Sequence, residues 1–348
     1  MWHGMIFRHF RIGSVVLLAT AIAVDHAHAA DFYEGKTIRL IIGNNTSGGY
    51  AVFGRLFAQY FGRHVPGNPK IVVQYMPGAG GVVLGNYLAN VAAPDGLTIG
   101  MIPRGAPFQP LFGNSAAKFT AESFTWLGTT SSYGNDAYCL IVRSDSPYKT
   151  LADLQKAENP VPFGGTAAGD MNTDLVLVAK NVFNLNVRVV RGYQGPGEIA
   201  MAMERNEIVG RSFGMVALQM FSSDLVKEGK LRSLVQFGRK RWSGLPDVPT
   251  AHELAQSPDD NALIDLAEVP LLLARPYLAP PQIPAEAAAI LRKAFMETQS
   301  DPDYLADNEK LKSDVSPLSG EDIQQLVERI GKTSPALVER YKAAVGAK

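Results

Sequence analysis

Three glycine-rich turns have the composition expected of an anion-binding site. They are Gly43–Gly49, Pro77–Gly81 and Gly164–Asp170, and each follows an apolar run of strand length. Because each turn also opens a segment with helical character, unpaired backbone N–H groups and the positive end of a helix dipole face the end of the strand. A single turn of this kind often serves only packing. Three turns at corresponding strand ends predict a ligand cleft between two domains.

Side chains in and beside these turns complete the candidate ligand site. In the first half of the chain the candidates are Asn44, Asn45, Thr46, Ser47, Gly48, Gly49, Tyr50, Gly78, Ala79, Gly80 and Arg104. In the second half they are Gly165, Thr166, Ala167, Ala168, Thr173, Tyr193 and Arg211. The amide and hydroxyl side chains are hydrogen-bond donors, and the tyrosines offer hydroxyls or flat walls. Packing is the alternative explanation for both tyrosines.

Two of these candidates are arginines, whose planar guanidinium groups bind carboxylates through paired hydrogen bonds. Arg104 follows a predicted strand, and Arg211 follows the short apolar pair Ile208-Val209 and a glycine. A solvated loop charge is the alternative for Arg104, and a salt bridge on the surface or between strands is the alternative for Arg211. Asp170 is expected to stabilise the start of a helix, because a carboxylate facing an anionic ligand would repel it.

The sequence offers little for a metal or a nucleotide cofactor. Beyond the first thirty residues only His64, His252 and the single cysteine Cys139 remain, too few for a structural zinc site built from His and Cys. A carboxylate-rich metal site stays open but has no signature. Cys139 lies in an apolar run and is expected to be a buried, inert thiol. None of the glycine-rich turns matches a nucleotide-binding motif, so no cofactor is expected.

A secreted serine esterase is the competing function. Gly210–Gly214 matches the G-x-S-x-G nucleophile elbow and supplies Ser212, while Asp224 or Asp247 and then His252 follow in the order of α/β-hydrolases. The strand before the motif is short, however, and the sequence has no His-Gly-Gly-Gly element for an oxyanion hole. The esterase is therefore the alternative to a binding protein.

Composition indicates a globular protein, and the first thirty residues indicate a signal peptide. The 348 residues are 46% hydrophobic, and 33 Lys and Arg balance 33 Asp and Glu, so nothing favours nucleic acid as a partner. Residues 1–30 combine Arg8 and Arg11, the apolar run Ile12–Val24 and the small residues Ala27–Ala29, which predicts a secretory signal peptide and a periplasmic location. An uncleaved anchor is the alternative, although the run is shorter than a membrane span needs.

Apolar runs alternate with amphipathic segments, which predicts an α/β fold with mostly parallel sheets. The predicted strands are Ile38–Ile42, Ile71–Tyr75, Thr98–Ile102, Tyr138–Val142, Val161–Phe163, Val187–Val190 and Leu231–Phe237. The predicted helices are Tyr50–Phe61, Val82–Val91, Leu151–Glu158, Asn172–Phe183, Ile199–Arg205, Pro284–Gln299, Pro302–Leu311 and Ser319–Tyr341, the last with a capping pattern at Ser319 and Asp322. The rhythm breaks at Thr125–Asp136, which is interpreted as the crossing into a second domain. The predicted domains are 31–133 with 241–348, and 134–240.

Six short motifs spread over the whole chain carry a family resemblance. They are Ile38–Ile41, Pro77–Gly81, Ala93–Ile99, Gly192–Gly197, Leu245–Thr250 and Leu278–Pro281. Together they resemble the periplasmic solute receptors of tripartite tricarboxylate transporters, also called Bug proteins. The resemblance implies a type II periplasmic binding protein, in which two α/β domains close on a small organic carboxylate. It also implies a non-enzymatic monomer that delivers this ligand to membrane permease subunits.

Two segments depart from the usual pattern of that family. Many members carry Pro-x-x-Pro-Gly-Gly in the first turn, whereas Asn44–Ser47 fill it here and add side-chain donors. Ile208–Arg211 replaces the usual valine-aspartate. The resemblance therefore leaves open which carboxylate is bound.

Overall fold

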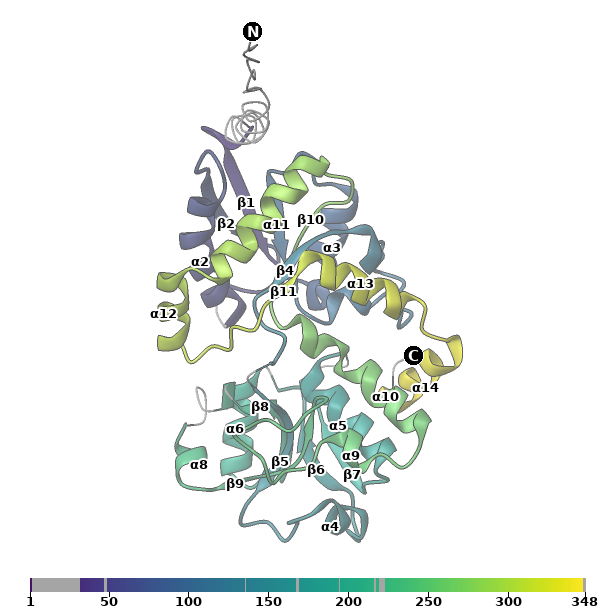
Figure 1. Ribbon diagram of the computed structural model, residues 1–348. Helices are drawn as coiled ribbons and strands as arrows, with labels where there is room; N and C mark the ends of the chain where they lie inside the picture. The colour runs from purple at the N-terminus through teal and green to yellow at the C-terminus, as the bar shows by residue number, and fades with distance from the viewer. Residues whose placement is uncertain are drawn as a thin grey trace.

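The computed structural model describes residue 1 and residues 32–46, 49–134, 136–166, 169–193, 195–215, 217–218 and 223–346. Apart from Met1, the predicted signal peptide lies outside the described residues, as do Ser47, Gly48, Ala167 and Ala168. Within the described part, two α/β domains lie one above the other, each built on its own sheet (Figure 1). No helix in that part is long and apolar enough to cross a membrane.

The upper domain in Figure 1 contains a sheet with the order β11-β4-β10-β3-β1-β2 among the described residues. Its strands are β1 (Thr37–Ile42), β2 (Lys70–Tyr75), β3 (Thr98–Met101), β4 (Thr125–Thr129), β10 (Pro276–Ala279) and β11 (Leu318–Ser319). β1, β2 and β3 are parallel, so the turns that follow them lie at one edge of the sheet. The helices of this domain are α2 (Gly49–Phe61), α3 (Val82–Asn90), α11 (Ala285–Gln299), α12 (Pro302–Lys310) and α13 (Gly320–Gly331).

The lower domain contains a second sheet, with the order β7-β6-β8-β5-β9 among the described residues. Its strands are β5 (Tyr138–Arg143), β6 (Val161–Gly164), β7 (Val187–Val190), β8 (Gly210–Gly214) and β9 (Leu231–Phe237). The α-helices packed with it include α4 (Leu151–Gln155), α5 (Met171–Val182), α6 (Pro196–Glu204), α8 (Ser223–Lys227) and α9 (Ala251–Leu254). The side chains of β5 from Tyr138 to Val142 are buried, so both faces of this strand belong to the domain core.

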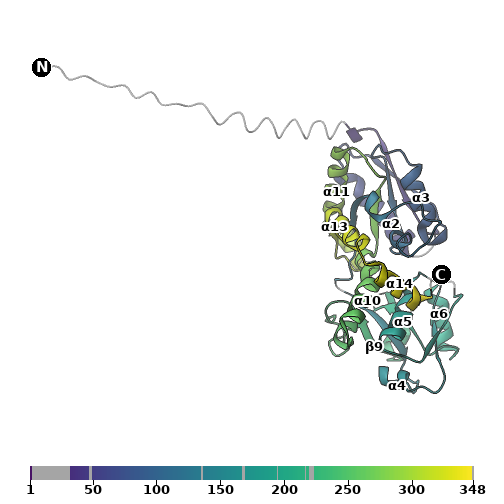
Figure 2. The same cartoon turned by 90° about the vertical axis from the view of Figure 1, so that its right-hand side faces the viewer.

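Two further helices, α10 (Pro258–Glu268) and α14 (Pro335–Val345), pack against each other and against α5 (Figure 2). The Asn181 amide also donates a hydrogen bond to the carbonyl oxygen of Ala344 at the end of α14, and α9 packs on β9. We propose that α9, α10 and α14 belong to the second domain, whereas the boundary predicted at residue 241 assigns them to the first. Short 3-10 helices complete the described elements: Gly62–His64, Ala79–Gly81, Ala106–Phe108, Ala121–Ser123 and Val269–Leu273.

The predicted elements correspond closely to the observed ones, with three corrections. The predicted break at Thr125–Asp136 contains strand β4, which is held by antiparallel pairing with β10. The sheets are mixed rather than mostly parallel, because the strands next to the crossings pair antiparallel. The predicted helix Ser319–Tyr341 is two helices, since Ser334 caps α14 and Pro335 opens it. The predicted cap at Ser319 and Asp322 is confirmed as a capping box.

Candidate functional site

The turns after β1, β2 and β3 meet around Pro103. A Cβ atom on Gly43 would lie 2.8 Å from Pro103 Cδ, and one on Gly81 would lie 2.6 Å from the same atom. Side-chain carbons do not approach this closely, so glycine is required at both positions, and Gly81 also has a left-handed φ of 99°. The sequence therefore brings the first two glycine-rich turns together beside Arg104.

Arg104 is surrounded by tyrosines at the edge of the first domain. Its backbone N–H donates to the Tyr50 hydroxyl at 3.0 Å, and that hydroxyl donates to the carbonyl oxygen of Ala274 at 3.1 Å. The guanidinium donates to the Tyr133 hydroxyl at 3.1 Å. Its Cζ atom lies 5.5 Å from the centre of the Tyr133 ring and 5.9 Å from that of Tyr138. Among the described residues, the side-chain partners of Arg104 are thus tyrosines and not carboxylates.

Tyr138 connects this arginine to the second domain. Its hydroxyl donates to Asn172 Oδ1 at 2.6 Å, and burial raises the pKa of this tyrosine above its ordinary value. Asn172 lies in the first turn of α5, where its backbone N–H donates to the Asp170 carboxylate. The Thr166 hydroxyl also donates to Asp170, at 2.6 Å. Asp170 is therefore the N-cap of α5, which confirms the predicted helix-stabilising role.

Arg211 is buried in β8, with 1% of its surface exposed. Its Cζ atom lies 4.0 Å from the centre of the Phe213 ring. Burial lowers the pKa of Arg211 to about 10, and electrostatic interactions with Tyr138 and Asp170 oppose that shift. The group remains protonated at neutral pH, so the second domain holds a positive charge near Tyr138.

The turn after β6 is closely packed. A Cβ atom on Gly165 would lie 2.6 Å from Thr173 Oγ1 and 2.7 Å from Val189 Cγ1. Thr173 is fully buried, and its hydroxyl has no hydrogen-bond partner among the described residues. Packing therefore requires glycine at position 165. The buried hydroxyl of Thr173 can still form a hydrogen bond with a ligand or a water molecule.

The two domains touch at this site. A Cβ atom on Gly105 would lie 3.3 Å from the carbonyl oxygen of Gly169, and one on Gly169 would lie 3.0 Å from Gln109 Nε2. The turn that follows β3 therefore contacts the turn that follows β6. This connected group of turns, strands and first helical turns contains six of the predicted candidates, Tyr50, Arg104, Gly165, Thr166, Thr173 and Arg211.

Other candidates make no described contact with the side chains of Arg104, Tyr138 or Arg211. Asn45 and Thr46 are exposed, and the carbonyl oxygen of Thr46 accepts a hydrogen bond from Arg55. The stretch Gly78, Ala79 and Gly80 is exposed, with φ values of 143°, 46° and 63°. Tyr193 packs against the small apolar cluster of Ile199, Ala202, Met203 and Ile208. Two candidates are half-buried, Gly49 at the start of α2 and Asn44, whose Oδ1 atom is buried without a hydrogen-bond partner among the described residues.

Sequence reasoning missed Tyr133, Tyr138 and Asn172. Tyr138 begins an apolar strand and Asn172 begins a helix, so both read as ordinary core and helix residues. The break in rhythm before Tyr138 was the available signal, because Tyr133 lies within it. These residues acquire a role only through their contacts with Arg104 and α5.

The structure contradicts the esterase alternative. A nucleophile elbow is a sharp turn between a strand and a helix, whereas Gly210–Gly214 is itself strand β8, paired with β5 and β6. Ser212 is fully buried opposite Leu140. Both ring nitrogens of His252 lie within hydrogen-bond distance of other groups, Asn261 and Glu268. The two candidate acids, Asp224 and Asp247, are exposed.

The prediction for Cys139 is confirmed. The side chain is fully buried in β5, and burial raises the pKa of its thiol to about 12. At neutral pH the reactive thiolate is therefore scarcely populated.

A family model described as "Tripartite tricarboxylate transporter family receptor" matches residues 64–342. The chain belongs to this receptor family. The predicted resemblance is thereby confirmed, and membership of a receptor family agrees with the failure of the esterase geometry. A curated relative, the UPF0065 protein in the gbd 5' region of Cupriavidus necator, is 25% identical over 345 residues, or 97% of this chain and 98% of the relative.

Solved structures confirm the fold expected of a two-domain periplasmic solute-binding protein. A TctC solute-binding protein from Polaromonas has a TM-score of 0.67 and 19% identity, covering 91% of this chain and all of its own. MatC from Rhodopseudomonas palustris, solved with bound malate, has a TM-score of 0.62 and 18% identity, covering 89% of this chain and 99% of its own.

Proposed function

We propose that this receptor binds a small organic carboxylate between its two domains and delivers it to the membrane permease subunits of a tripartite tricarboxylate transporter. The observation that carries this proposal is Arg104. It is a half-buried cation at the junction of the domains, and its side-chain partners among the described residues are tyrosines.

A carboxylate ligand would supply the negative charge that the described side-chain partners of Arg104 do not carry. The Tyr133 hydroxyl takes one of the donors of the Arg104 guanidinium, which leaves further N–H groups for a paired interaction with a carboxylate. The buried charge of Arg211 and the N-terminus of α5 add positive potential from the second domain. The tyrosine rings beside Arg104 provide flat apolar walls for the carbon skeleton of the ligand. The malate found in the similar MatC structure belongs to the same chemical class.

Ligand capture proceeds by closure of the two domains about the crossing segments. In the arrangement described here, the turn after β3 already touches the turn after β6. A ligand that contacts both domains binds this arrangement more tightly than one in which the turns are apart, and so it shifts the population toward closure. The candidate residues on both turns, including those outside the described part, remain the proposed ligand contacts.

The cellular setting completes the proposal. The signal peptide predicted in residues 1–30 exports the chain to the periplasm, where a monomeric receptor meets both its ligand and the permease. Family membership supports this setting, since the family consists of receptors of tripartite tricarboxylate transporters.

A thermal-shift screen tests the function directly. The panel contains monocarboxylates, dicarboxylates such as malate, tricarboxylates and aromatic acids, each paired with its neutral amide. A ligand at a hundredfold excess over its Kd stabilises the folded state by about 2.7 kcal/mol. We expect at least one acid to raise the melting temperature and its amide to leave it unchanged. Equal responses to acids and amides would contradict recognition of a carboxylate.

A further inference from the structure

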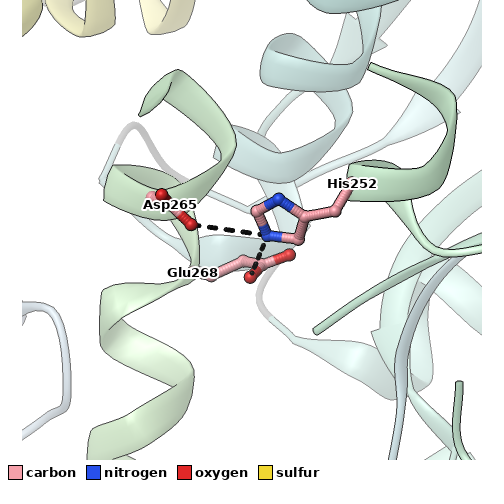
Figure 3. Close-up of side chains that lie close together, drawn as sticks. All are labelled: His252, Asp265 and Glu268. Carbon is pink, nitrogen blue, oxygen red and sulfur yellow. Dashed lines mark hydrogen bonds and ion pairs between the residues drawn. The ribbon is translucent and has the colours of Figure 1, made fainter. Parts of the chain in front are cut away.

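A group of three metal-ligating side chains lies in the second domain, and none of them belongs to the proposed carboxylate site. His252 is on α9, and Asp265 and Glu268 are on α10, with their side chains pointing toward one another (Figure 3). One ligand atom from each of the three lies within 4.8 Å of the others. His252 Nε2 is 3.0 Å from Glu268 Oε2 and 3.5 Å from Asp265 Oδ1.

The hydrogen bonds around the group orient these atoms inward. Asn261 Nδ2 donates to the carbonyl oxygen of Ser257, which turns Asn261 Oδ1 toward the ring at 2.9 Å from His252 Nδ1. Nδ1 therefore carries a hydrogen, and Nε2 faces the two carboxylates. The backbone N–H of Gly238 donates to Glu268 Oε1 at 2.7 Å, which leaves Oε2 directed at the ring. Histidines that bind a metal through one ring nitrogen usually donate the N–H of the other ring nitrogen to an oxygen atom.

The group is enclosed on one side and accessible on the other. The side chains of His252 and Glu268 are 12% and 10% exposed. Asp265 and Glu268 line a cavity of about 1040 Å³, whose wall also includes Tyr133 and Trp242. An ion thus has a path from solvent to the two carboxylates, with the histidine behind them.

The three side chains of the group are of the types that bind divalent cations. Two carboxylates face one imidazole, and Asp265 is also ion-paired with Arg239. Three more basic side chains line the cavity, namely Lys240, Arg241 and Arg329. The Arg239 side chain is 71% exposed, so water can solvate its charge when the carboxylate takes another partner.

We propose that His252 Nε2, Asp265 and Glu268 bind one Zn²⁺ ion, with the fourth coordination position open to the cavity. Zinc takes nitrogen and carboxylate oxygen ligands at about 2.0–2.1 Å in a tetrahedron, whose ligand atoms are then roughly 3.3 Å apart. The two distances from Nε2, 3.0 and 3.5 Å, match that spacing. Binding removes the proton from Nε2 and displaces Arg239, so zinc affinity falls as the pH falls. A bound ion ties α9 to α10 and stabilises the second domain.

Zinc titration of the chelator-stripped, exported protein tests this site. Calorimetry at pH 7.5 in the absence of carboxylate ligand is expected to give one Zn²⁺ per chain, and the ion should raise the melting temperature. Glu268→Gln keeps the acceptor for Gly238 but removes the charge, so its zinc affinity should fall at least about tenfold. Asp259→Asn, an exposed change in the first turn of the same helix, is the matched control and should bind zinc like the wild type.

A measurement on the unaltered protein covers the case of a variant that fails to fold. Co²⁺ in the same site should give the intense visible absorption of a four-coordinate ion, and an equivalent of Zn²⁺ should abolish it. Wild-type protein without stoichiometric zinc binding would overturn the proposal, as would a folded Glu268→Gln variant that binds zinc with wild-type affinity. Neither result bears on the carboxylate site, which contains none of these side chains.

Discussion

Replacement of Asp174 by asparagine should change the pH dependence of stability. Asp174 lies in the first turn of α5 with its carboxylate buried. Burial raises its pKa from 3.8 to about 7, although hydrogen bonds donated by the Gly169 N–H and the Tyr341 hydroxyl oppose the shift. At a pH between 3.8 and about 7, the folded protein therefore holds a proton on the Asp174 carboxyl group that the unfolded chain has lost.

The sign and size of the effect follow from proton linkage. Between pH 4 and pH 7 the folded state binds more protons at this group than the unfolded state, so stability falls as the pH rises through that window. Each pKa unit corresponds to about 1.4 kcal/mol. A rise from 3.8 to about 7 thus corresponds to at most roughly 4 kcal/mol, which the wild type has below pH 4 and has lost above pH 7.

The asparagine side chain in the Asp174→Asn variant is neutral at every pH. Its amide oxygen can still accept from the Gly169 N–H, while its NH2 group can donate to the Tyr341 hydroxyl. Urea unfolding from pH 5 to pH 8 measures the free energy of unfolding of both proteins. We expect Asp174→Asn to be more stable at pH 8 by a few kcal/mol, and the difference to shrink toward pH 5. Parallel curves for the two proteins would refute the reasoning, because Asp174 would then titrate alike in both states.

Tyr138→Phe leaves Asn172 Oδ1 buried without its donor, so urea unfolding should show a loss of about 1–3 kcal/mol; unchanged stability would mean that water replaces the hydroxyl. Gly165→Ala places a Cβ 2.6 Å from Thr173 Oγ1, so the melting temperature should fall, and a native melting temperature would show that the turn can relax. Small-angle X-ray scattering should give a smaller radius of gyration with bound carboxylate, whereas identical profiles at saturation would contradict closure on the ligand.

Strands were predictable where apolar residues run together between polar segments. β1 and β5 are of this kind, and their buried faces explain the signal. β4 escaped prediction because Gly128 interrupts it: that residue has a φ of 155°, and a Cβ there would meet the Phe295 ring at 2.1 Å. The need for glycine arises from a helix far along the chain, which a local pattern does not contain.

The candidate site was predictable in its turns but not in its connections. Spacing after strands pointed to Arg104 and to the turn at Gly165, since residues after parallel strands gather at one edge of a sheet. Tyr138 and Asn172 look like core and helix residues until their contacts with each other and with Arg104 are known. The Gly210–Gly214 motif suggested a nucleophile elbow because the same residues are compatible with a turn and with an interior strand.

Isothermal titration of the acid identified by thermal shift, into wild type, Arg104→Gln and Arg188→Gln, tests the central claim most directly. Arg188 is an exposed arginine on β7 and serves as the control for the loss of a positive charge. We predict one site per chain, an affinity at least about tenfold lower in Arg104→Gln, which corresponds to about 1.4 kcal/mol, and wild-type affinity in Arg188→Gln. Equal affinities in all three proteins would contradict an Arg104-centred carboxylate site.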